Sequence, residues 1–330
     1  MALRDQKWDN VKFILIFLVV LGHIADIYAD ISPATGYIRF FIYMFHMPLF
    51  IFVSGLFSKK NVKYKRYDKI FSYLVLYVFI KILIFISRWI GEGKMPAFRL
   101  FYEGSAPWYA FALFAFCLIT IFTDRFDPKY IFAISVILAL AAGYDNRIGD
   151  HFCLSRIIVY YPFFFAGYLL EPAKVKEFFD RWYFKLASAF VIAVSFIIIV
   201  NFYDEIKDIK FLFTGRNSYY DVFKWNSPYA FLIRALCYVI SAVLGCCIIS
   251  LTPENFGRGI PAKIGENSVQ IYALHYPLKV LWFSLVSDRF HIDALFTSKL
   301  VLYEIIVSVV LMALCILPFW KPVFRKVLKG

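Results

Sequence analysis

Long apolar runs alternate with short polar segments over most of this chain, from residue 11 to residue 320. Most runs approach the roughly 20 residues that an α-helix needs to cross a bilayer at about 1.5 Å per residue. Backbone in lipid must satisfy its own hydrogen bonds, and the runs lack the short alternating pattern of barrel strands, so we expect helices. The predicted spans are 11–29, 37–57, 70–90, 107–123, 130–143, 153–171, 184–203, 229–252, 267–287 and 299–320.

Basic residues set the predicted orientation of these helices. If the N-terminus is cytoplasmic, the cytoplasmic segments hold roughly twice as many Lys and Arg as the outer segments, as the positive-inside rule expects. The segment 58–69, which includes Lys65 and Arg66, contributes most to this difference. We therefore predict a single all-α domain over residues 1–330. It is a polytopic bundle of about ten transmembrane helices in the plasma (inner) membrane, with both termini cytoplasmic.

Composition agrees with a lipid-embedded chain. Hydrophobic residues make up 62% of the sequence, more than a soluble chain of 330 residues can bury in one or two cores. The net charge is +13, but the basic residues lie between apolar runs and form no basic stripe on a soluble domain. Nucleic acid is therefore not an expected partner. The six Cys lie inside apolar segments without metal-ligand spacing, so we expect buried thiols and no metal site.

The first span places two ionisable side chains on one helix face. Lys12 and His23 are eleven residues apart, which is about 1100° of helical rotation and about 16 Å of rise. A cation at the cytoplasmic rim suits an anionic, phosphate-bearing ligand, and a deeper imidazole suits proton transfer. Asp9 either orients Lys12 or caps the helix. The alternative is a snorkelling lysine and a histidine satisfied by a neighbouring helix.

Two further spans carry an imidazole beside a proline. In the second span, Pro48 removes a helix hydrogen bond near His46, which then lines a cavity or bonds a freed carbonyl. In the ninth, Asn267 or Ser268 can cap the helix that carries His275 near mid-depth. The two histidines, Asn267 and Ser268 are candidate substrate contacts. Three ionisable residues in the outer halves of their helices are candidates too, namely Arg156, Arg234 and Glu304. They could equally pair with one another.

Together these segments resemble the acyltransferase 3 family of integral membrane acyltransferases, over about residues 4–318. The family's first helix carries an acid, a cation and, eleven residues after the cation, a histidine, as Asp9, Lys12 and His23 do here. Its second-helix motif matches Phe45 to Phe50 followed by Ser54 and Gly55. Its late motif matches Gly265, Asn267, Ser268, Ile271, Tyr272, His275 and Pro277, and weaker echoes include Pro107, Trp108, Tyr109, Pro162, Gly167 and Tyr168.

The resemblance implies an O-acetyltransferase. The donor is acetyl-CoA on the cytoplasmic side, with Lys12, Lys65 and Arg66 as candidate CoA contacts. The acceptor is a hydroxyl of a cell-surface glycan or its lipid-linked precursor, with Trp108 among its contacts. His23 acts as catalytic base or as transient acyl carrier, and Asp9 with Lys12 completes the catalytic group.

One residue departs from the common family pattern. Many members have Arg where this chain has Lys12, a point charge without the planar fork of guanidinium. A lysine at the position of Lys12 makes this chain resemble the fucose-acetylase-like branch of the family.

Two other classes of protein use similar residues. A transporter or flippase for a lipid-linked glycan also needs intramembrane His, Arg and Glu. It does not need a basic mouth of CoA size, and the chain shows no convincing internal repeat. A third alternative is a catalytically silent membrane scaffold.

Overall fold

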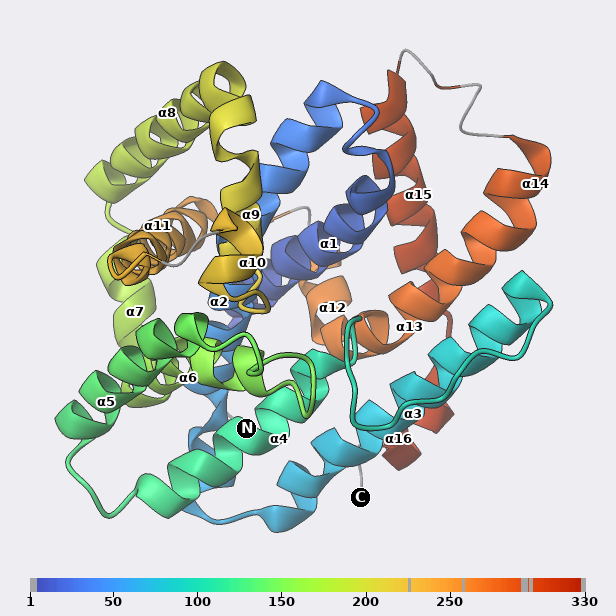
Figure 1. Cartoon of the computed structure of the whole chain (residues 1–330). Coiled ribbons are helices and arrows are strands. Elements are labelled where there is room, and N and C mark those ends of the chain that lie inside the picture. Colours follow the sequence, from blue (N-terminus) through green and yellow to red (C-terminus); the bar gives the residue numbers. More distant parts are fainter. Residues whose placement is uncertain (1–4, 225–226, 257–258, 292–295, 297–298, 328–330) are drawn as a thin grey trace. The chain divides into compact units, whose positions relative to one another are not determined.

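Helices make up most of the chain in the computed structural model, which describes residues 5–224, 227–256, 259–291, 296 and 299–327. Tyr102 and His151 pair with each other in an isolated antiparallel bridge. No strand occurs among the described residues. Figure 1 shows the helices in chain order. The prediction of an all-helical fold is confirmed.

The helices divide into two compact units. Unit 1 comprises residues 1–42, 75–100 and 252–330, and unit 2 comprises residues 43–74 and 101–251. Two helices continue from one unit into the other, α2 (Pro33–Lys63) and α3 (Tyr67–Glu92). Unit 1 also contains α1 (Gln6–Tyr28), α12 (Ile260–Glu266), α13 (Ser268–Trp282), the π-helix Phe283–Ser287, α14 (Asp288–Phe290), α15 (Leu300–Cys315) and α16 (Trp320–Val327). Unit 2 contains α4 (Trp108–Thr123), α5 (Pro128–Ala141), α6 (Leu154–Leu169), α7 (Pro172–Phe179), α8 (Trp182–Ile206), α9 (Lys210–Phe213), α10 (Tyr219–Phe223) and α11 (Ala230–Leu251), with 3₁₀ turns at Ala142–Tyr144 and Lys207–Ile209.

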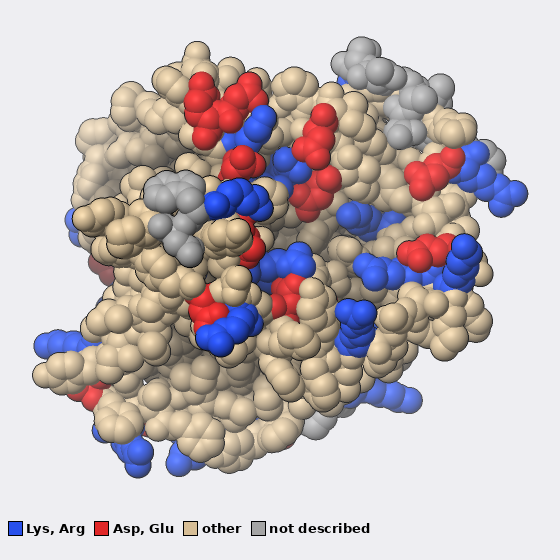
Figure 2. Space-filling model, viewed as in Figure 1, with Lys and Arg blue, Asp and Glu red and all other residues tan. Residues whose placement is uncertain are grey.

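Five stretches are long and apolar enough to cross a membrane within the described residues. They are α1, α2, α3, α11 and the stretch Trp182–Phe213. A sixth results if α15 and α16, which meet at a bend of 73°, count as one span. Every predicted span coincides with a helix, but α4, α5 and α6 are short, so ten crossings are not confirmed. The chain is a multi-pass membrane protein by these criteria, and most of the face in Figure 2 is uncharged.

Unit 1 is built around α1. This helix begins after Asp5, whose side chain accepts a hydrogen bond from the backbone N–H of Lys7 at 3.0 Å. A carboxylate at this position satisfies an amide that has no partner within the helix. The helix then packs against α12, α13 and α15, which Figure 1 shows in orange and red beside the blue α1. The N-cap is therefore Asp5, so of the two alternatives for Asp9 the one in which it caps this helix is wrong.

In unit 2, α2 and α6 approach each other through two glycines. A Cβ at Gly55 would fall on the carbonyl oxygen of Phe164, and one at Gly167 would fall on the carbonyl oxygen of Phe52. Glycine permits this reciprocal backbone contact, as small residues do between membrane helices. Because Gly55 belongs to the second sequence motif and Gly167 to a weaker one, helix packing explains both.

This contact predicts that Gly55→Ala destabilises the protein. The added methyl meets backbone atoms, which cannot rotate away, so the two helices must separate. We expect a loss of about 1–3 kcal/mol of folding free energy, measured by thermal or denaturant unfolding in detergent. Gly149→Ala is the matched control, because a Cβ at Gly149 meets no atom within 4 Å. Equal stability of the two variants would contradict the proposed packing.

Pro48 lies inside α2 without ending the helix. Its ring nitrogen cannot donate to the carbonyl of Met44, four residues earlier. The hydroxyl of Ser241 in α11 donates to that carbonyl instead. A side chain from another helix thus satisfies the acceptor that proline leaves free, as expected for membrane helices.

All six Cys are free thiols, and five of them are buried. The prediction of unpaired Cys in the apolar interior is confirmed for these five. Cys246 is partly exposed.

Candidate functional site

In unit 1, α1 carries a stripe of four polar side chains. The carboxylate of Asp9 pairs with the ammonium of Lys12 at 3.1 Å, and the pair His23 and Asp26 repeats the same spacing further along. Since α1 is continuous from Gln6 to Tyr28, all four fall within an arc of about 100°. The structure confirms that Asp9 contacts Lys12, which leaves the ammonium only partly accessible, with 22% of the side chain exposed.

His23 is bordered by an acid. Its Nδ1 lies 4.0 Å from a carboxylate oxygen of Asp26, and about a quarter of its side chain is exposed. Asp26 also lies 3.9 Å from the guanidinium of Arg39 in α2. At 4.0 Å this contact is longer than a hydrogen bond, so Asp26 acts on the ring through its charge.

His275 of α13 packs directly on His23. The two ring centroids are 5.4 Å apart with an interplanar angle of 26°. Nδ1 of His275 lies 3.0 Å from the carbonyl oxygen of Ile271 and 2.8 Å from that of Tyr272. Two acceptors require the proton on Nδ1, so Nε2 carries a lone pair. This Nε2 is buried and has no hydrogen-bond partner among the described residues.

The junction between α12 and α13 brings the first and third sequence motifs together. A Cβ at Gly265 would fall on the carbonyl oxygen of Asp9, so α12 crosses α1 at backbone contact beside Lys12. Asn267 is the N-cap residue of α13, as predicted, but its side chain does not cap. Its amide donates to the carbonyl of Lys263 at 2.8 Å, and Ser268 is buried. The expectation of a side-chain cap from Asn267 is therefore wrong.

Glu304 of α15 is fully buried in unit 1. One carboxylate oxygen accepts a hydrogen bond from the hydroxyl of Thr35 at 2.7 Å. The other oxygen is buried and has no hydrogen-bond partner in the described chain. Thr35 thus tethers the start of α2 to α15.

Unit 2 contains a buried ionic cluster that links three loops. Arg156 of α6 contacts a carboxylate oxygen of Asp150 at 2.9 Å and donates to the carbonyl of Glu103 at 3.1 Å. Arg216 donates from Nε to the other oxygen of Asp150 at 2.9 Å. Burial acts to lower the pKa of Arg216, but the hydrogen bond and charge of Asp150 outweigh it and raise that pKa. The guanidinium of Arg156 lies 5.1 Å from the ring centroid of Trp108.

Arg234 of α11 is held by backbone carbonyls. It donates to Asn217 at 2.8 Å and to Ala139 at 3.3 Å, and it lies 4.8 Å from the ring centroid of Tyr219. Arg156 and Arg234 thus have partners of their own, and Glu304 binds Thr35. The prediction that these three pair with one another is wrong.

The remaining predicted residues of unit 2 lie at two places. His46 is buried in α2 with its ring edge to Tyr43, at 5.1 Å between centroids. Lys65 and Arg66 are exposed at the turn between α2 and α3, where Lys65 adopts a φ of 47°. Arg66 lies 3.8 Å from the carboxylate of Asp68.

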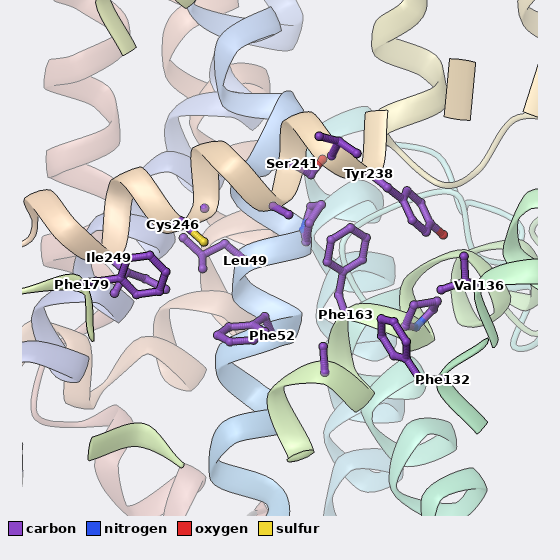
Figure 3. A pocket seen from close by; sticks show the side chains of 16 residues that line it. Leu49, Phe52, Phe132, Val136, Phe163, Phe179, Tyr238, Ser241, Cys246 and Ile249 are labelled. Carbon is purple, nitrogen blue, oxygen red and sulfur yellow. The ribbon is translucent and has the colours of Figure 1, made fainter. Parts of the chain in front are cut away.

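A cavity of about 320 Å³ lies in unit 2 between α2, α5, α6, α7 and α11. Figure 3 shows its wall of aromatic and aliphatic side chains, such as Phe52, Phe132 and Phe163. The lining holds no imidazole and no charged group. It therefore offers no base for acyl transfer.

Sequence reasoning missed Asp26 and Asp150 as members of the polar groups. The spacing of His23 and Asp26, three residues apart on a helix, is a signal that could have identified Asp26. Asp150 has no such signal, because Arg216 is far away in the sequence. No group of three or more His, Cys, Asp or Glu within the described ranges has the arrangement of a metal site.

Comparison with known proteins identifies relatives of this chain. A family model described as an acyltransferase domain matches residues 5–320. The nodulation protein NolL of Sinorhizobium fredii is 28% identical over 184 residues, which is 50% of this chain and 48% of that protein. NolL of Mesorhizobium japonicum is 40% identical over 70 residues, or 20% of this chain and 18% of that protein. These matches span less than half of either relative, and no solved structure matches.

Proposed function

Because this chain belongs to the acyltransferase 3 family, we propose that it is an O-acetyltransferase of the plasma membrane. It transfers the acetyl group of cytoplasmic acetyl-CoA to a hydroxyl of a surface glycan or its lipid-linked precursor. The family supports a membrane acyltransferase, and the observation that carries our more specific proposal is the stacked pair of His23 and His275 beside Asp26.

His23 is the general base in this proposal. The acceptor hydroxyl attacks the thioester carbonyl carbon while its proton moves to Nε2 of His23. The tetrahedral intermediate then expels the CoA thiolate, which takes the proton from the imidazolium, so the base is regenerated. Asp26 orients the ring and stabilises the transient imidazolium. The lone pair on Nε2 of His275 accepts a hydrogen bond from the bound substrates.

The donor enters from the cytoplasmic side in the predicted topology. CoA is polyanionic, so we expect its phosphates on the basic cytoplasmic side. The proposed phosphate contact in unit 1 is Lys12 of α1, and the candidates in unit 2 are Lys65 and Arg66 in the exposed turn between α2 and α3. Asp9 fixes the ammonium of Lys12. The thin pantetheine arm spans the distance of about 16 Å along α1 from Lys12 to His23.

The acceptor binds from the outer side in the same topology. Trp108 offers a half-buried aromatic surface to a sugar ring, and Arg156 and Arg234 lie at the same predicted level. His46 in unit 2 and Glu304 in unit 1 are further proposed acceptor contacts. Asn267 and Ser268 lie at the predicted cytoplasmic start of α13 and are proposed contacts of the donor.

Acetyl-CoA is expected to stabilise the purified protein. At a hundredfold excess over the dissociation constant, binding adds about 2.7 kcal/mol to the unfolding free energy, measured as a rise in Tm. Loss of one contact to a charged phosphate costs about 1.5–3 kcal/mol, so Lys12→Ala should weaken acetyl-CoA binding at least tenfold.

Lys174→Ala is the matched control. Lys174 is exposed, lies in a predicted cytoplasmic segment and pairs with an acid three residues away, as Lys12 does. A transporter for a lipid-linked glycan would gain no stability from acetyl-CoA. If acetyl-CoA left the Tm of the wild-type protein unchanged, the proposed function would therefore be contradicted.

A further inference from the structure

Lys279 of α13 lies beside the imidazole pair of unit 1. It follows His275 by four residues, so both side chains lie on one face of the helix. Its ammonium lies 5.2 Å from the ring centroid of Tyr276. The same ring receives His23 edge-on at 5.4 Å between centroids. His23 and Lys279 therefore contact one aromatic ring.

Arg88 of α3 adds a second cation at this place. Gly91 follows Arg88 by three residues in α3. A Cβ at Gly91 would lie 2.7 Å from the hydroxyl of Ser284 and 3.8 Å from the side chain of Val280. The end of α3 therefore packs against the helix turn that follows Lys279. The charge of Arg88 repels that of Lys279.

The acids nearby do not neutralise these two cations. Asp26 attracts Lys279, but Asp26 lies within 4.0 Å of both His23 and Arg39. Arg39 also contacts Asp30 at 3.5 Å. In the part of the chain that the structure describes, neither Lys279 nor Arg88 has a carboxylate within ion-pair distance. Two like charges held in a partly buried site destabilise it unless an anion binds between them.

We propose that Lys279 and Arg88 bind a carboxylate or phosphate group of the acceptor, which makes the acceptor an anionic glycan. This inference rests on the proposed acetyl transfer. Lys279 is about 18 Å along α13 from Asn267, and His275 is about 12 Å along it. The cations thus lie beyond the imidazoles as seen from the predicted cytoplasmic end. CoA phosphates stay at that end, so the anion belongs to the acceptor.

The test uses membranes that contain the full chain, radiolabelled acetyl-CoA, and envelope glycans of the producing organism. Anion exchange separates these glycans into acidic and neutral fractions, and each fraction is offered as acceptor. We expect label in the acidic fraction. Lys279→Gln should raise the KM for that fraction about 10- to 100-fold with little change in kcat, because a charged contact of about 1.5–3 kcal/mol is lost. Lys279→Arg should restore most of the affinity.

Lys81→Gln is the matched control. Lys81 is also a lysine within a helix, with its ammonium 5.8 Å from the ring centroid of Tyr77. Stabilisation by acetyl-CoA checks that each variant folds, and Arg88→Gln replaces Lys279→Gln if the latter does not. Label confined to the neutral fraction, an unchanged KM, or a loss in kcat alone overturns the inference and leaves acetyl transfer standing. Label in neither fraction overturns the proposed function as well.

Discussion

His23→Ala should lower the rate of acetyl transfer by about 100- to 10,000-fold, the contribution of a positioned general base. Alanine cannot accept the hydroxyl proton, so the attacking oxygen must carry it into the transition state. The side chain is partly exposed and packs against His275, so its removal should leave the helix bundle intact. The measurement is turnover of radiolabelled acetyl-CoA in membranes with the native acceptor.

His291→Asn serves as the control for this variant. His291 is exposed and adopts a φ of 47°, a conformation that Asn tolerates well. The His291→Asn variant should keep wild-type turnover. The Tm shift with acetyl-CoA should persist in both variants. Near-wild-type turnover of folded His23→Ala protein would eliminate His23 as the base.

The same protein distinguishes a base from an acyl carrier. If His23 carries the acetyl group covalently, radiolabelled acetyl-CoA without acceptor leaves label on the denatured protein, and His23→Ala abolishes that label. A general base leaves none. We expect none.

The local parts of the candidate site could be predicted from sequence. Helical periodicity alone places Lys12 and His23 on one face, because α1 is uninterrupted. The proximity of Asp9 to Lys12 follows from their spacing of three residues, and the structure places them in contact. A fixed repeat of 3.6 residues per turn needs no tertiary information.

Contacts between distant segments could not be predicted from periodicity. The resemblance did identify Gly265 and Gly55, but only the structure shows that each permits a backbone contact with another helix. The stacking of His23 on His275 likewise depends on how α13 packs against α1. Side-chain partners at such separations are set by packing, which one sequence does not encode in any short pattern.

The number of crossings shows a second limit. Every span predicted from hydropathy coincides with a helix, but α5 extends only from Pro128 to Ala141, and Asp127 and Pro128 fix its start. A helix of this length spans about 21 Å, less than the hydrocarbon layer of about 30 Å. Apolar composition therefore predicts that a segment avoids water, and does not by itself predict that it crosses.

Asp150→Ala should destabilise unit 2 by about 3–5 kcal/mol, the cost of leaving a buried charge without its partner. Only 6% of the Asp150 side chain and 5% of the Arg156 side chain are exposed. Without the carboxylate, Arg156 keeps its charge and loses the group that compensates for its burial. Thermal or denaturant unfolding in detergent measures this loss.

Arg216→Ala should cost much less than Asp150→Ala. Arg216 is 42% exposed, so solvent screens its contact, and its removal leaves the buried pair of Asp150 and Arg156 intact. Asp145→Ala is the surface control: the hydrogen bonds of Arg147 lower the pKa of Asp145 to about 2, but the Arg147 side chain is 86% exposed, so solvent screens this pair. We expect little change in its stability. If Asp150→Ala were no less stable than Asp145→Ala, the ionic cluster would not be what holds the three loops of unit 2 together.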